Sequence, residues 1–308
     1  MKSDEGKQAR KAVQMIFSRK PNTFSLYLKG IIAKRRGLMP GEKIQEMKVE
    51  WKDFRIDPSH LNKVSALCGL HQSGTMPLIY PLTFLFPLHM IMIAHEKFPL
   101  LYLRMLHIRD HIRQNRPVGT GEVLHISCKI QGQRVMPKGL EFDIHSLVSS
   151  EDEPVWEGIS TNFFPWSFGE PGQPSLLAGF DPLPDECDTV QWTMPRGSGL
   201  RFGLLIGDYN GIHYLAPYAR MLGFKRDFSH AQRSMAECLR RLPSLNGNEP
   251  LCLDVSLKGP VYYSERVTLK YAGRNGGYRF DLLASGDDRP RIMGNIFQAE
   301  TGQLQNRM

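Results

Sequence analysis

Residues 76–95 read "MPLIYPLTFLFPLHMIMIAH", a stretch without any Lys, Arg, Asp or Glu. A helix of this length and composition could cross a lipid bilayer. The stretch also holds three prolines, at positions 77, 81 and 87, and two histidines, and no second stretch of this kind follows it. A helix that is apolar on every side can instead form the buried centre of a soluble domain. We therefore expect a buried helix here rather than a membrane span.

Strand-like patterns follow this helix. Apolar and polar residues alternate in "VLHISCKI" (123–130) and in "LEFDIHSLV" (140–148), which is typical of strands with one buried face. Similar runs flank them at 102–114 and 155–165. Residues 168–188, rich in Gly, Pro and acidic side chains, then indicate a linker.

The succession of a helix and strands occurs again beyond the linker. A helix is predicted at 229–242, and a strand is predicted before it at 199–206, "GLRFGLLI". Further strands are predicted at 251–259, 265–274, 277–285 and 289–300, and "RNGG" (274–277) is a hairpin turn signal. Each half thus offers one main helix and a run of antiparallel strands. This predicts an α+β fold in which each sheet wraps its own helix.

We divide the chain into four parts on this basis. Residues 1–50 form a basic extension with short, amphipathic helical patterns, 51–168 a first α+β unit, 169–190 a linker and 191–308 a second unit. The extension could attach to an anionic membrane surface or pack on the main body with a solvated basic face, and we favour packing. Its first twenty residues contain no uninterrupted apolar segment, which argues against a signal peptide.

Composition narrows the class of partner. The chain of 308 residues carries a net charge of +8 and has a pI near 9.2, which suggests an anionic partner such as a carrier protein, a membrane surface, a nucleic acid or a phosphorylated cofactor. No nucleic-acid-binding module is recognisable, and no Walker or GxGxxG pattern is present. Five scattered cysteines without a CxxC pair fit a reducing, cytoplasmic setting.

The stretch "LLIGDYNGIHYLAPYARMLGF" (204–224) brings Asp208, Asn210 and His213 into six residues. An acid and an imidazole at this spacing around a turn can point into one cleft and hold a water between them, with the imidazole exchanging protons near neutral pH. Gly207 and Gly211 would let the backbone turn tightly. The alternative is a surface turn in which the Asp and Asn side chains bond only their own backbone.

The segment "GDYNGIHYLAPYARMLGF" resembles the hydratase-2 signature of the MaoC-like (R)-specific enoyl-CoA hydratases and 3-hydroxyacyl dehydratases. The family pattern is G-D-x-N-P-[aliphatic]-H, followed by Ala and Gly-Phe, and the aromatic residue that precedes it is matched by Phe202. Eight positions match, namely Gly207, Asp208, Asn210, Ile212, His213, Ala219, Gly223 and Phe224. The broad resemblance covers residues 50–300, and its specific part is 200–231.

The resemblance implies a fold and a role for each matching residue. The fold is a tandem (double) hot-dog, with a degenerate first unit that helps to bind the acyl chain and a catalytic second unit. Asp208 and His213 would hold and activate the water that adds to the double bond of a trans-2-enoyl thioester, and Asn210 would support the loop. The carrier is coenzyme A or acyl carrier protein, which are both anionic, and the protein would be a monomer or homodimer with no cofactor.

Three positions depart from the family pattern. The backbone N–H that bonds the thioester oxygen usually belongs to Gly in a His-Gly step, which is His230-Ala231 here; Ala231 can still supply its amide at a helix N-terminus. Ile206 and Gly211 replace a small hydroxyl-type residue and a proline. These changes leave two rival functions open, an acyl-CoA-binding protein without activity and a thioesterase on the same fold.

Other polar residues are expected to be structural. "HIRDHIR" (107–113) could touch phosphates, but we expect a solvated strand face. His89 and His95 are expected to be core histidines, and "SGDD" (285–288) to be a turn. No HExxH or comparable spacing occurs, so no metal is predicted.

Overall fold

The computed structural model describes residues 12–19, 21–32, 34–71, 74–175, 179–274 and 276–298. The described strands form one sheet in the order β1-β2-β4-β5-β6-β3-β8-β11-β10-β9-β7. The strands are β1 (Val13–Phe17), β2 (Met47–Arg55), β3 (Leu106–Gln114), β4 (Val123–Met136), β5 (Gly139–Ser150), β6 (Glu153–Pro165), β7 (Asp188–Thr193), β8 (Leu251–Leu257), β9 (Arg266–Arg274), β10 (Gly277–Ala284) and β11 (Pro290–Gln298).

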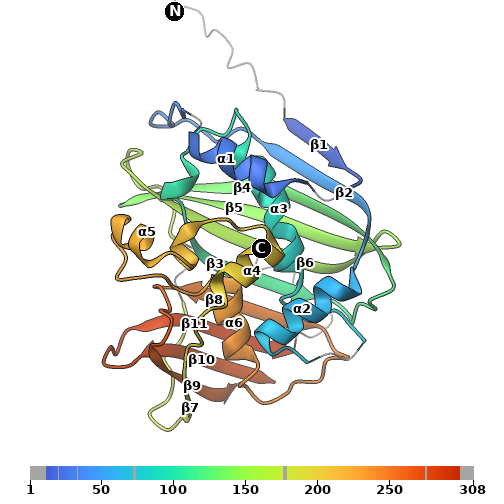
Figure 1. Ribbon diagram of the computed structural model, residues 1–308, viewed down its shortest axis with the longest axis vertical. Coiled ribbons are helices and arrows are strands. Elements are labelled where there is room, and N and C mark those ends of the chain that lie inside the picture. The colour runs from blue at the N-terminus through green and yellow to red at the C-terminus, as the bar shows by residue number, and fades with distance from the viewer. Residues whose placement is uncertain are drawn as a thin grey trace, which may run out of the picture.

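The helices lie across one face of this sheet (Figure 1). They are α1 (Thr23–Ile32), α2 (Pro58–Cys68), α3 (Pro81–Ala94), α4 (Gly199–Ile206), α5 (Ala216–Met221) and α6 (Ala231–Leu239), with short 3-10 turns η1 (Tyr102–Arg104) and η2 (Gly211–His213). The predicted α+β class is therefore confirmed.

Two halves of the chain meet in the middle of the sheet. Strand β3 ends the first group of strands and β8 begins the second, and the two pair antiparallel with Asp110 opposite Val255. The helix α3 belongs to the first half and α6 to the second. The hairpin predicted at 274–277 joins β9 to β10, with Arg274 opposite Gly277.

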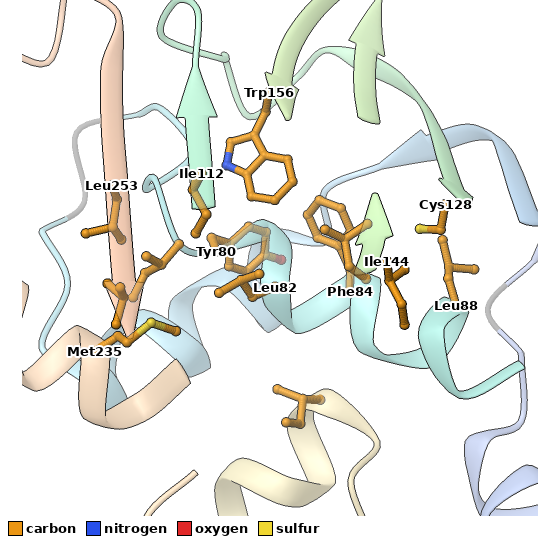
Figure 2. Packing of buried hydrophobic residues seen from close by; sticks show 14 of the residues in the cluster. Tyr80, Leu82, Phe84, Leu88, Ile112, Cys128, Ile144, Trp156, Met235 and Leu253 are labelled. Atoms are coloured by element: carbon orange, nitrogen blue, oxygen red, sulfur yellow. The ribbon is translucent and has the colours of Figure 1, made fainter. Parts of the chain in front are cut away.

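The helix α3 is buried, as its composition predicted. Twelve of its fourteen residues are buried, although Pro87 lies inside it. Figure 2 shows how the core forms around it, with Tyr80 and Phe84 beside Trp156, and Leu88 beside Cys128 and Ile144. The indole N–H of Trp156 donates to the carbonyl oxygen of Leu78 at 2.8 Å, which joins the sheet to the entry of the helix. Within the described ranges, no helix combines the length and apolar character needed to cross a membrane.

One predicted strand is a helix. Residues 199–206 form α4, whose buried residues are Gly199, Phe202, Gly203 and Ile206. Their spacing of three and four residues is the helical period, and Leu200 and Leu204 fall on the exposed side. The strand prediction was wrong because the apolar run is almost continuous. Such a run fits the two-residue period of a strand and the 3.6-residue period of a helix equally well.

The N-terminal extension is only partly helical. The helix α1 forms as predicted and contacts α3, but Val13–Phe17 is a strand that pairs parallel with β2. Burial alternates along these five residues, which suits a half-covered edge strand better than the predicted helix. Residues 1–11 lie outside the described residues. The predicted packing of the extension on the main body is seen in both α1 and β1.

The solvated face expected for residues 107–113 is also a wrong prediction. These residues belong to β3, and because the two halves join there, the strand has a neighbour on both sides. The side chains of Arg109 and His111 are only 12% and 13% exposed, and Arg109 Nη2 lies 3.0 Å from the Asp254 carboxylate on β8. The turn expected at 285–288 is present.

Arg35 closes the C-terminal end of α3. Its Nη1 donates to the carbonyl oxygens of His95 (2.6 Å) and Phe98 (3.0 Å), and its Nη2 donates to those of Ala94 (3.0 Å) and Ile93 (3.3 Å). The carbonyls of Ile93 and Ala94 belong to the last turn of α3, where carbonyl groups have no partner within the helix, so a cation is favoured there. The extension thus stabilises the end of the buried helix.

We expect Arg35→Met to lower the free energy of unfolding by roughly 2–4 kcal/mol, because it leaves several partly buried carbonyl groups without a donor. Urea denaturation followed by circular dichroism measures the change. Arg36→Met is the matched control: its ion pair with Glu42 is exposed, so its loss should cost much less than the loss of Arg35. Equal effects of the two changes would contradict the role of Arg35.

Candidate active site

The motif begins where α4 ends. Gly207 has a left-handed conformation, with φ 81°, and its N–H donates to the carbonyl oxygen of Gly203 at 2.8 Å. A Cβ atom at this position would lie 2.5 Å from Thr23 Oγ1 of α1. Glycine is therefore required here both by the backbone and by the helix that packs against the start of the loop.

Asp208 and Asn210 form the local turn that was the alternative to a catalytic loop. The N–H of Asn210 donates to Asp208 Oδ1 at 2.9 Å, and the N–H of Ile212 donates to Asn210 Oδ1 at 3.3 Å. The turn is not on the surface, however, because Asp208 is only 6% exposed and both residues line a cavity. The turn fixes one oxygen of the carboxylate and leaves Oδ2 for other groups.

His213 faces this second oxygen. Its Nδ1 lies 3.0 Å from the carbonyl oxygen of Phe228, which can only accept, so Nδ1 carries the proton. In the neutral ring Nε2 is then unprotonated, and it lies 3.7 Å from Asp208 Oδ2. This separation is too long for a direct hydrogen bond, but a single water can contact both atoms. The geometry supports the predicted Asp-His pair.

His230 is a third member of the site. It precedes α6, is 1% exposed, and its ring stacks on that of His213 with the centroids 3.7 Å apart and the planes at 24°. Its Nε2 also lies 3.7 Å from Asp208 Oδ2. The sequence indicated His230 only as pocket support, and the structure places its ring beside the carboxylate.

The three side chains include donors that metals use, since their ligand atoms lie within 4.8 Å of one another. The ring geometry of His213 and His230 does not suit a shared ion. Lone pairs of imidazoles lie in the ring planes, and two stacked, nearly parallel planes have no common point near both nitrogens. The donor set therefore fits a water better than a metal ion.

Burial shifts the proton equilibria of all three groups. It raises the pKa of Asp208, against the opposing effect of His213. It lowers the pKa of His213, against the opposing effects of Asp208 and of the Phe228 carbonyl. Burial, with His213 and Arg233 nearby, also puts the pKa of His230 well below its usual value. Both imidazoles are therefore uncharged at neutral pH, and His213 Nε2 is available as a base.

The site opens into a cavity of about 430 Å³ that lies between the two halves. The first half contributes an apolar wall from one stripe of α3, and the second half contributes the motif and the start of α6. The α3 residues on this wall are Leu82, Phe86, Met90 and Ile93, together with His89. An apolar cavity with a few converging polar groups is the usual form of a site for a small molecule with an apolar part.

Two tyrosines from outside the motif hold the loop. Tyr102, which lines the cavity, is hydrogen-bonded through its side chain to Asn210. Tyr27 of α1 packs edge-on against Tyr102, with centroids 5.9 Å apart, and also lies 6.4 Å from the ring of Tyr209. Sequence reasoning missed both, and no local signal could have found them because they lie more than a hundred residues from the loop.

The remaining predicted residues also gather here. Ala231 lines the cavity as the first residue of α6, where backbone N–H groups have no partner within the helix. Gly211 opens the turn η2, and Ile206 is fully buried behind the loop. Phe202 packs on His230, with centroids 5.1 Å apart. The structure thus brings together every residue that the sequence assigned to the site.

No family model matches the chain. It is 22% identical over 274 residues to the 3-hydroxyacyl-thioester dehydratase X of Mycobacterium tuberculosis (strain ATCC 25618 / H37Rv), a match that covers 87% of this chain and 97% of the relative. The crystal structure of HtdX from that species has a TM-score of 0.67 at 21% identity and covers 82% of this chain and 100% of its own.

Two further solved structures share the fold. A MaoC-like dehydratase from Phytophthora capsici has a TM-score of 0.65 at 15% identity, over 83% of this chain and 95% of its own. A 12:0-ACP thioesterase from Umbellularia californica has a TM-score of 0.55 at 10% identity, over 83% and 98%. In sequence and in fold the chain is similar to the MaoC-like dehydratases, which confirms the resemblance that its Gly-Asp-x-Asn motif indicated.

Proposed function

We propose that the protein is a hydro-lyase that hydrates trans-2-enoyl thioesters and dehydrates (R)-3-hydroxyacyl thioesters. The observation that carries the proposal is the pairing of His213 Nε2 with Asp208 Oδ2 across 3.7 Å in the lining of an apolar cavity. A water between these two atoms would lie beside an acyl chain bound in the cavity. The similarity to a 3-hydroxyacyl-thioester dehydratase over nearly the whole length supports the same reaction.

In the hydration direction, the water between Asp208 and His213 gives a proton to His213 Nε2 while its oxygen bonds to C3 of the substrate. The electrons of the C2=C3 bond move toward the thioester carbonyl. The backbone N–H of Ala231, at the positive end of α6, donates to the carbonyl oxygen as negative charge develops on it. Return of the proton to C2 completes the addition of water, and dehydration is the reverse.

The proposed architecture is a tandem hot-dog. In this view residues 51–168 are the degenerate acyl-binding unit, 169–190 the linker and 191–308 the catalytic unit, each built on one of the helices α3 and α6. The cavity wall from α3 supports a role of the first unit in binding the acyl chain. Coenzyme A or acyl carrier protein as the carrier, a monomeric or homodimeric state, membrane contact through the extension and a cytoplasmic location stay predictions.

Thioester hydrolysis is the second candidate, since a thioesterase shares the fold. It requires water to attack the carbonyl carbon rather than C3. The two reactions give different products, a free acid with a released thiol or a 3-hydroxyacyl thioester, and mass spectrometry of the product separates them.

We expect Asp208→Asn and His213→Ala each to lower kcat for trans-2-enoyl-CoA by roughly 10²–10⁴-fold, because each removes a group that holds or deprotonates the water. Loss of the enoyl-thioester absorbance in the ultraviolet measures the rate, and chiral analysis of the product tests the (R) configuration. The matched controls are Asp287→Asn, in the turn that superficially repeats the motif, and His71→Ala at an exposed position. Full activity in either site variant would contradict the assignment.

The pH dependence follows from the same two groups. Activity needs His213 neutral and Asp208 ionised. The pKa of His213 lies below its ordinary 6.5 and that of Asp208 above its ordinary 3.8, so kcat/KM should fall as the pH is lowered, with a midpoint at the higher of the two shifted pKa values and therefore above pH 3.8. Initial rates at low substrate concentration measure this profile. A kcat/KM that stays constant down to pH 3.8 would contradict it.

A further inference from the structure

A second group of polar side chains lies in the same cavity, on the wall that the first half provides. His89 of α3, His107 of β3, and Ser160 and Asn162 of β6 all line it. Their neighbours on this wall are apolar, and none of the four belongs to the motif. We call these four residues the polar subsite.

A buried carboxylate orients the polar subsite from behind. Asp110 is 0% exposed, and its Oδ1 accepts from Ser160 Oγ at 2.7 Å and from His107 Nε2 at 3.0 Å. His107 Nε2 also lies 3.2 Å from the carbonyl oxygen of Arg109, so this nitrogen carries a proton. Asp110 Oδ2 is buried and has no partner among the described residues. Asp110 therefore fixes the orientation of the Ser160 and His107 side chains before a ligand binds.

Hydrogen-bonding capacity is left over on the cavity side. His107 Nδ1 makes no hydrogen bond to any residue in the described ranges, and Ser160 uses its proton on Asp110 and keeps its lone pairs. The Asn162 amide donates through Nδ2 to the carbonyl oxygen of Ser160 at 3.3 Å, which leaves its own Oδ1 as an acceptor. A plain hydrocarbon chain against this wall would displace water from these atoms and leave them unsatisfied, which is unfavourable.

The chemistry of the subsite selects a hydroxyl group. Asp110 and its hydrogen bonds raise the pKa of His107, although burial opposes them. Nδ1 is a donor when the ring is charged and an acceptor when it is neutral, and a hydroxyl can pair with either. The Asn162 and Ser160 oxygens accept the hydroxyl proton. A carboxylate is disfavoured because the buried Asp110 carboxylate lies directly behind the subsite.

We propose that the polar subsite of His89, His107, Ser160 and Asn162 binds a hydroxyl group on the acyl chain, separate from the one that hydration creates at C3. The preferred substrates are then acyl thioesters that already carry a hydroxyl further along the chain. This inference rests on the proposed function, because it takes the cavity to be the acyl-binding site.

The test compares trans-2-enoyl-CoA substrates of equal chain length, one unsubstituted and the others with a single hydroxyl at successive positions beyond C3. The unaltered protein should show kcat/KM at least about tenfold higher for one hydroxylated isomer than for the unsubstituted chain, since a site built for a hydroxyl discriminates against its absence. Asn162→Leu and His107→Phe should each bring the ratio of kcat/KM between the hydroxylated and the unsubstituted substrate close to one. Asn248→Leu, an exposed position, is the matched control.

The affinity for acyl-CoA provides a second measurement, which does not depend on turnover. Saturated acyl-CoA with and without the hydroxyl is titrated calorimetrically into the inactive Asp208→Asn protein and into its combination with Asn162→Leu. Asn162 is chosen because its loss leaves the bonds to Asp110 intact. Tighter binding of the hydroxylated ligand by about tenfold, lost in the double variant, is the expected result.

The outcomes distinguish the two proposals. Equal kcat/KM for both kinds of substrate in the unaltered protein overturns the subsite and leaves the hydratase function standing. A large loss of kcat on the unsubstituted substrate in both subsite variants also overturns it, since these residues would then serve the reacting group. If no thioester is hydrated, the proposed function fails, and the calorimetric comparison alone decides whether the cavity selects a hydroxylated chain.

Discussion

The burial of an almost entirely apolar helix is the constraint on which the rest of the structure depends. Because α3 is apolar around nearly its whole circumference, other segments have to cover it, apart from the stripe that lines the cavity. The sheet covers one side, and α1 and α4 contact the helix as well. Segments from the first half, which include the N-terminal extension, therefore pack into one core with segments from the second half. The basic extension, through α1 and Arg35, is part of this cover rather than a separate appendage.

The helices that cover α3 also bury the candidate active site. The loop that carries Asp208 follows α4 directly, and α1 packs on its first residue, so the carboxylate is withdrawn from solvent together with His213 and His230. In water these groups would have ordinary proton affinities. Burial moves the pKa of Asp208 up and those of the two imidazoles down, which brings the proton affinities of the acid and the imidazoles closer together. Fold stability and proton transfer therefore depend on the same contacts.

Sequence reasoning succeeded where the information is local. The composition of 76–95 identified α3, Gly276 and its neighbours identified a hairpin, and the spacing of Asp208, Asn210 and His213 indicated three residues that line one cavity. It failed where contacts between distant segments determine the structure. The edge position of β1, the central position of β3 and the reach of Tyr102 to Asn210 depend on pairings between distant segments, and nothing within a short window encodes them. The strand predicted at α4 was a different failure, since its apolar run is too continuous to show one period clearly.

The three departures from the motif gain a physical explanation from their surroundings. The Ile206 side chain is fully buried and lies outside the cavity lining, so its size does not reach the reacting atoms. At Gly211 a Cβ atom would lie 2.9 Å from the ring of Tyr218, so the absence of proline follows from that packing. The proposed role of Ala231 uses only its backbone amide, which its methyl group leaves unchanged. None of the three alters the Asp208–His213 pair, and an inactive binding protein is accordingly the weaker interpretation of this site.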